Sequence, residues 1–146
     1  MPTNLMADQL SQIIAQATAP AFLLGAVAGF VSVLIGRLNR IVDRGASLLA
    51  IADDDKDFEK RKLKNEVPRL RQRAKLMNHA IEYAVASGIC TTFLVIVAFV
   101  SALVGLHHAY GSAILFAIAL AFFATSLIYP WLELKIAIKQ LESAFG

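Results

Sequence analysis

The sequence is poor in charge and contains almost no cysteine. Cys90 is the single cysteine among 146 residues, so the chain cannot form an intramolecular disulfide. Charged residues make up only 17% of the chain and hydrophobic residues 58%, whereas a water-soluble domain of this length carries more charge. Two long tracts, residues 9–36 and 83–132, contain no Lys, Arg, Asp or Glu. This composition excludes an ordinary soluble domain and indicates a membrane protein.

The motifs that carry catalysis are also missing. The sequence contains no phosphate-cradling glycine loop, no recognisable pair of nucleophile and base, and no cluster of metal ligands. The acidic run 53–57 begins like a calcium loop, but Phe58 stands where glycine is required and Lys64 where the bidentate acid belongs. His107 and His108 have no neighbouring acid or thiol to complete a metal site. We therefore expect a protein that is not an enzyme and has no cofactor and no metal.

Three uncharged, apolar segments are each long enough to cross a bilayer, namely residues 19–36, 84–106 and 113–132. At about 1.5 Å per residue, a helix of about 20 residues covers the roughly 30 Å hydrocarbon core. Lipid offers no partner to unpaired backbone groups, so a segment that crosses it alone must be helical. The sequence predicts an all-α protein in which residues 1–146 form a single membrane domain with three transmembrane helices.

The N-terminal residues 4–17 have the spacing of an amphipathic helix. This helix either lies on the outer leaflet or continues into the first span with a kink at Pro20. A positively charged segment of the kind that opens a secretory signal is missing, so we expect no cleaved segment.

The positive residues predict the direction of the spans. Of the 14 Lys and Arg residues, 12 lie between Arg37 and Lys75, and the other two, Lys135 and Lys139, follow the third span. After three crossings the central segment and the C-terminus lie on one side, and basic residues favour the cytoplasmic side. We expect the N-terminus outside, with a helical hairpin at about 37–83 and a C-terminal helix at about 133–146 in the cytoplasm.

Apolar residues keep a helical spacing beyond each predicted span. Their positions alternate by four and three, as in helices that pack along a seam. The three seams are Leu34, Leu38, Ile41, Gly45, Leu48 and Ala52; Leu63, Val67, Leu70, Ala74, Met77, Ile81 and Ala84; and Trp131, Leu134, Ile138, Leu141 and Phe145. The pattern predicts a three-helix cytoplasmic stalk. Pro68 is expected in the first turn of its helix, and Gly45 is expected to weaken or end the first helix.

Small residues form one face of the first predicted span. This face, the small-residue face, consists of Gly25, Gly29, Ser32 and Gly36. Such residues let helix backbones approach closely in a membrane. The pattern is compatible both with packing inside one chain and with association between copies. Together with the other packing faces it favours a homo-oligomer.

Three arginines follow on the same broad side of this helix. If small-residue faces join several copies, Arg37, Arg40 and Arg44 would form a pore mouth or a site for lipid headgroups. The alternative is an ordinary cytoplasmic anchor. Glu82, the acid nearest the second span, is a candidate for a buried ion pair with Arg37, or else it reaches water at the interface.

These patterns lead to two functional hypotheses. A simple ion-conducting pore comes first, because the arginines lie below the small-residue face and Ser87, Thr91 and Ser101 could wet a channel. Hydroxyls in membrane helices also bond to their own backbone carbonyls, so a scaffold or accessory subunit without transport is the alternative. The expected partners are the lipid bilayer, further copies of the chain and anionic lipid headgroups at the basic segment, and no nucleic acid.

Two blocks of sequence carry a resemblance to a known family. They are A-P-A-F-L-L at residues 19–24 and R-L-N-R-I-V-D-R at residues 37–44. With them the chain resembles a bacterial family of small three-helix membrane proteins known as a domain of unknown function, over nearly its whole length. The resemblance implies the three-span topology and a bacterial inner membrane, and it implies no activity.

Overall fold

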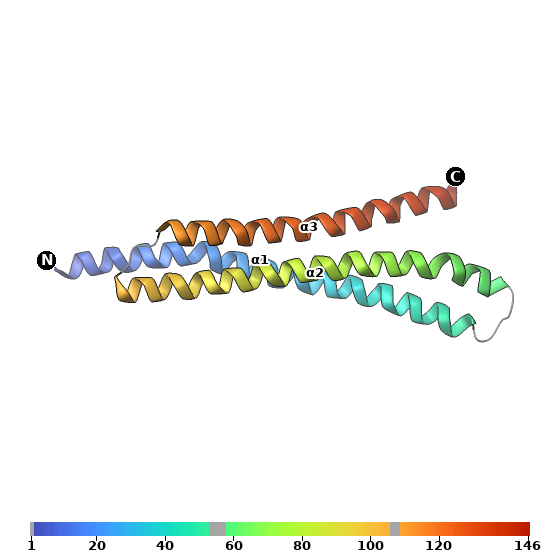
Figure 1. Ribbon diagram of the computed structural model, residues 1–146, viewed down its shortest axis with the longest axis horizontal. Coiled ribbons are helices and arrows are strands. Elements are labelled where there is room, and N and C mark those ends of the chain that lie inside the picture. The colour runs from blue at the N-terminus through green and yellow to red at the C-terminus, as the bar shows by residue number, and fades with distance from the viewer. Residues whose placement is uncertain (1, 53–57, 106–108) are drawn as a thin grey trace. The chain divides into compact units, whose positions relative to one another are not determined.

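The chain folds into three long helices (Figure 1). The computed structural model describes residues 2–52, 58–105 and 109–146. Helix α1 covers Pro2–Ala52, α2 covers Phe58–Val104 and α3 covers Ala109–Phe145. Over these described ranges there is no strand. All three helices are long and apolar enough to cross a membrane, within Thr3–Ile51, Lys64–Val104 and Tyr110–Phe145. The predicted all-α fold is confirmed, and the protein is a multi-pass membrane protein.

Each helix continues through one internal proline: Pro20 in α1, Pro68 in α2 and Pro130 in α3. Proline removes one i→i−4 hydrogen bond, but the flanking turns retain theirs. The N-terminal segment therefore runs directly into the first span, which is the second of the two alternatives. The prediction for Pro68 is wrong, because α2 already begins at Phe58. The Lys-, Arg- and Glu-rich residues before Pro68 are good helix formers.

Glycine ends helix α2 but does not interrupt helix α1. Helix α1 passes through Gly45 and ends at Ala52. Helix α2 ends at Val104, just before the predicted limit of the second span at residue 106. The next residue, Gly105, has a φ of 70°, a left-handed conformation that side-chain-bearing residues avoid, and so it terminates the helix. The predictions for the acidic turn 53–57 and for His107 and His108 lie outside the described residues.

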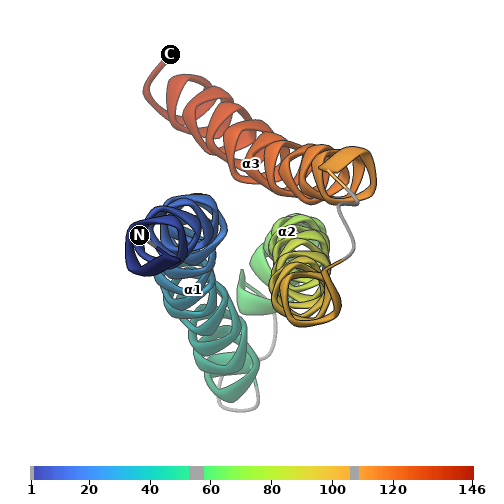
Figure 2. The same ribbon diagram turned by 90° about the vertical axis from the view of Figure 1, so that its left-hand side faces the viewer.

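The chain divides into two compact units, each made of parts of all three helices. Unit 1 comprises Met1–Phe30 and Ala84–Ala124, and unit 2 comprises Val31–Tyr83 and Thr125–Gly146. Figure 2 shows that the helices of unit 1, whose ends face the viewer, do not lie in one plane. In such an arrangement, each helix can bury the side that faces the other two helices of the unit.

In unit 1 all three pairs of helices are in contact. Cγ1 of Val27 in α1 lies 3.5 Å from where a Cβ would stand on Gly88 of α2. Ser87 Oγ of α2 donates to the carbonyl of Ala119 in α3 at 2.7 Å. The ring of Phe30 in α1 meets that of Phe123 in α3 edge to face, with 5.6 Å between centroids. Small residues and one hydroxyl thus bring the helices together, as is typical of membrane helices.

In unit 2 the predicted seam of α1 is confirmed at three of its large side chains, and a fourth, Leu38, is half-buried. Leu34, Ile41 and Leu48 are buried, and Met77 of the α2 seam is fully buried. The predicted α3 seam is wrong, because all five of its residues, Trp131, Leu134, Ile138, Leu141 and Phe145, are exposed. The buried face of α3 contains Ser126 and Glu133 instead. Since α3 is apolar nearly all round, hydrophobic spacing cannot identify its inner face.

Candidate functional site

A buried carboxylate joins the three helices of unit 2. Glu133 of α3 is only 4% exposed. Arg73 of α2 donates to its Oε1 from Nε at 2.7 Å, and Nη2 lies 2.6 Å from the same oxygen. Nη1 of Arg37 in α1 lies 3.7 Å from Oε2. Burial of a carboxylate is tolerated only with such partners, so Glu133 ties α1 and α2 to α3.

A pocket of about 290 Å³ lies at this cluster, within unit 2. Its lining combines arginines with apolar side chains and consists of Arg37, Arg40, Ile41 and Arg44 from α1, Leu70 and Arg73 from α2, and Glu133, Leu134 and Ala137 from α3. Steps of three and four place the α1 arginines on one side of the helix. Four guanidinium groups and one carboxylate give the lining a formal charge of +3, which attracts anions.

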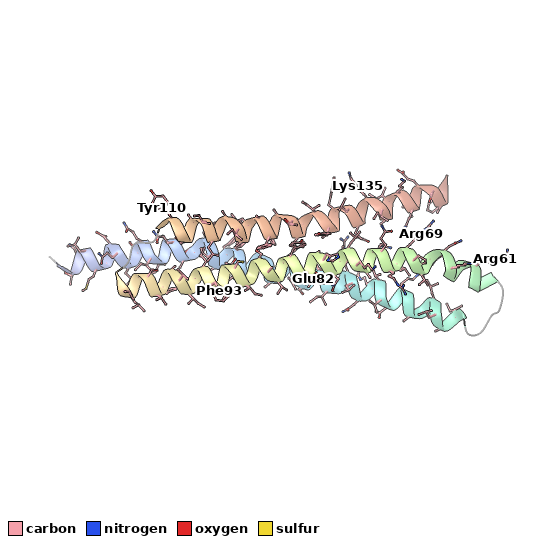
Figure 3. All side chains as sticks on the ribbon, in the orientation of Figure 1. Arg61, Arg69, Glu82, Phe93, Tyr110 and Lys135 are labelled. Atoms are coloured by element: carbon pink, nitrogen blue, oxygen red, sulfur yellow. The ribbon has the colours of Figure 1, made fainter. Side chains whose placement is uncertain are left out.

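The predicted ion pair between Glu82 and Arg37 is corrected by these contacts. The Glu82 side chain is 60% exposed on α2 (Figure 3). It accepts a hydrogen bond from Asn78 Nδ2 at 2.7 Å and lies 3.1 Å from His79 Nδ1. Arg37 does face an acid, but the acid is Glu133. The physical reason is that Glu82 is bonded along its own helix and is open to solvent, whereas Glu133 lies on the buried face of α3.

The small-residue face of α1 is open in a single chain. Nothing lies within 4 Å of where a Cβ would stand on Gly25, Gly29 or Gly36, and Ser32 is exposed. At about 100° per residue this face points away from the buried side, which carries Leu34. The alternative of packing inside one chain is therefore not realised among the described residues.

Of the two buried hydroxyls of α2, one connects two helices and the other bonds within its own helix. Ser87 bonds across to α3, and Thr91 Oγ1 donates to the carbonyl of Ser87 in its own helix at 2.8 Å. In the described part of the chain every buried side-chain nitrogen or oxygen has a hydrogen-bond partner. Sequence analysis left two alternatives for these hydroxyls, and Thr91 follows the one in which the hydroxyl bonds to its own backbone. Ser87 does neither, because it uses the carbonyl of a neighbouring helix.

Sequence reasoning missed Arg73, Glu133 and Ser126, whose Oγ donates to the carbonyl of Ala80 at 2.6 Å. The spacing of these residues in the sequence was nevertheless a signal for these contacts. The α2 residues in these contacts stand seven apart, at 73, 80 and 87, and so do their α3 partners, at 133, 126 and 119. Glu133 is also the first charged residue after a tract of apolar residues. Finding the pairs required the antiparallel register of α2 and α3.

The comparisons with known proteins give a family and nothing further. A family model described as a protein of unknown function, DUF2721, matches residues 17–143. The match confirms the resemblance to a family without assigned activity. No curated protein and no solved structure matches the chain.

Proposed function

This chain belongs to the DUF2721 family of proteins of unknown function. We propose that it forms a homo-oligomer in the membrane and acts through helix–helix contacts as a scaffold or accessory subunit. The observation that carries this proposal is the position of the arginines. Arg37, Arg40 and Arg44 line a pocket with Glu133 inside one chain. In a pore between copies, these arginines would have to face away from α3 and toward the axis between the copies. Because they line a pocket with Glu133 of α3 instead, their position favours a role in contact and binding over conduction.

The open face of α1 supports assembly. Gly25 and Gly29, four residues apart in the first span, present backbone with no covering side chain. In lipid such a face gains van der Waals contact when the backbone of a second helix lies against it. We propose that two copies of the chain meet there. The proposed setting is the bacterial inner membrane with the N-terminus outside, supported by the placement of the 14 positive residues.

A pore between copies is the second candidate. Arg40 and Arg44 line the pocket, and neither forms an ion pair with another described residue. Unpaired cations at the end of a span are a feature of anion-selective mouths. The proposal that the protein is no enzyme is common to both candidates and rests on the lack of reactive motifs in the sequence.

Flux and assembly measured on the same sample test the proposal. The purified protein is reconstituted into liposomes and assayed with chloride, phosphate, sodium and potassium gradients, and its oligomeric state is measured by cross-linking in the same vesicles. We expect an oligomer without flux. The variant Gly29→Leu should lose cross-linking, because its side chain keeps the helices apart. Ala19→Leu is the matched control, since Ala19 is exposed on α1 and lies about 80° or more around the helix from every member of the small-residue face.

Each result decides between the candidates. Flux that Gly29→Leu abolishes and Ala19→Leu preserves would replace the scaffold by the pore. A protein that is monomeric in the bilayer would contradict both, because both depend on contact between copies.

A further inference from the structure

Two arginines of the unit 2 pocket, Arg37 and Arg73, contact Glu133 but keep N–H donors that do not bond to it. Arginine has five N–H donors, and Arg73 makes its two contacts with Glu133 through Nε and Nη2. The donors of its Nη1 therefore stay available. Arg37 contacts Glu133 at 3.7 Å, and its side chain is 43% exposed, so this part of the pocket is open to solvent. Glu133 positions two arginines from different helices and still leaves them able to bind an anion.

Two further arginines in the same lining form no ion pair with any residue that the structure describes. Arg40 and Arg44 make no ion pair within the described ranges 2–52, 58–105 and 109–146. Glu133 is buried and its two oxygens face Arg73 and Arg37, so its charge is already compensated. An incoming anion meets a net positive surface and not an exposed carboxylate.

The chemistry of the lining selects among anions. Guanidinium forks match the oxygens of phosphate in pairs, and several forks around a small volume favour a group with several oxygens over chloride. A volume of about 290 Å³ is large enough for a phosphate together with a small attached group. Ile41, Leu70 and Leu134 form an apolar wall beside the arginines, which suits a phosphate that carries carbon atoms.

We infer that this pocket is a phosphate-binding site, in which Arg40 and Arg44 bind the phosphate oxygens together with the free donors of Arg73 and Arg37. The ligand is a phosphate group, supplied either by a free phosphate compound or by the headgroup of an anionic lipid. All lining residues belong to one chain, so the site does not depend on the proposed homo-oligomer.

Ligand-dependent stabilisation of the full-length protein in a non-ionic detergent tests this site. One arm compares sodium phosphate with sodium chloride at equal ionic strength. The other arm compares phosphatidylglycerol with phosphatidylcholine at equal mole fraction in the micelles. A ligand that binds only the folded state raises the melting temperature with its concentration, and the titration gives an apparent Kd. A rise with phosphate but not with phosphatidylglycerol identifies a free phosphate compound as the source, and a rise with phosphatidylglycerol, with or without a rise with phosphate, identifies the headgroup.

The variants Arg40→Gln/Arg44→Gln and Lys64→Gln/Arg69→Gln make the test specific. Both remove two positive charges from exposed positions of unit 2, but Arg40 and Arg44 line the pocket, whereas Lys64 and Arg69 of α2 do not. We expect the pocket variant to weaken binding by at least about tenfold, because hydrogen bonds to a charged ligand are lost. The control variant should bind within about twofold of the parent, because its two residues do not line the pocket and salt screens charges at a distance.

The contrary outcomes are equally definite. No stabilisation in either arm would overturn the inference, and so would an equal loss in both double variants, which would indicate diffuse attraction to a basic surface. Size exclusion and the melting temperature without ligand report whether the pocket variant folds. If it does not, the single variants Arg40→Gln and Arg44→Gln replace it, and unchanged binding in both would overturn the inference.

Discussion

Glu133 is a buried acid whose charge is compensated by two arginines from other helices. Its carboxylate is nearly inaccessible to water, and Arg73 provides its two short contacts. The contact with Arg37 is longer, and that side chain is partly solvated. Loss of Arg73 would therefore leave a buried negative charge with one distant partner, whereas loss of Glu133 would leave two guanidinium groups that can still reach water. The two substitutions are expected to differ in cost.

We predict that Arg73→Gln lowers the free energy of unfolding by about 3 kcal/mol, because it leaves a buried charge poorly compensated. Glu133→Gln should cost less, and the double variant should cost less than the sum of the single ones, since the two residues interact directly. Denaturant or thermal unfolding in detergent measures all three. Arg69→Gln, an exposed arginine on the same helix, is the control. If Arg73→Gln unfolds like this control, Glu133 is not held in a buried ion pair.

At the scale of the helices, the sequence predicted one inner face well and another poorly. Helix α1 buries Leu34, Ile41 and Leu48 as expected. The charged residues from Arg37 to Arg44 interrupt its apolar residues and give the pattern contrast. Helix α3 places apolar residues on nearly every side, so its pattern contains no contrast. Its inner face was decided by Ser126 and Glu133, which find partners on α2. Polar matching, not hydrophobicity, sets the orientation of α3.

Sequence reasoning could identify the arginines that α1 contributes to the candidate site, but not their partners on the other helices. Arg37, Arg40 and Arg44 share one helical side, which spacing alone reveals. The acid that Arg37 contacts comes from another helix, and its second partner Arg73 stands 60 residues before it in the chain. Sequence reasoning chose Glu82 because it lies close to a span, but proximity to a span says nothing about which side of the helix an acid occupies. That information exists only once the three helices are packed.

The orientation of the helices predicts a contrast between two apolar positions of unit 2. Met77→Asp should cost several kcal/mol, because Met77 is fully buried and the new carboxylate would have no partner. Ile138→Asp should leave the melting temperature close to that of the parent, because Ile138 is 49% exposed. Both variants should still insert into the membrane, since the predicted spans are unchanged. Melting curves in detergent decide the matter, and equal losses in the two variants would mean that α3 packs through its exposed apolar residues.

At the scale of the whole molecule, charge placement connects the fold to the membrane. Three helices of spanning length require the segment between α1 and α2 and the end of α3 to lie on one side. All 14 Lys and Arg residues fall in those two regions, and none falls at the start of α1 or between α2 and α3. Under the positive-inside rule such a chain has one favoured orientation, because the alternative would move every basic residue across the bilayer. We therefore expect the arginine pocket to face the cytoplasm.

Cysteine labelling in cells tests this orientation on the intact chain. Cys90→Ala removes the single native thiol, and Leu5→Cys and Arg61→Cys then each introduce one thiol at an exposed position on either side of the predicted first span. We expect a membrane-impermeant maleimide to label position 5 in intact spheroplasts, and position 61 only after the membrane is opened, because the segment around position 61 holds 11 other basic residues. Labelling of position 61 in intact cells would reverse the orientation. Labelling of both positions would be incompatible with a single crossing of α1 between them, and with it the three-span topology would fall.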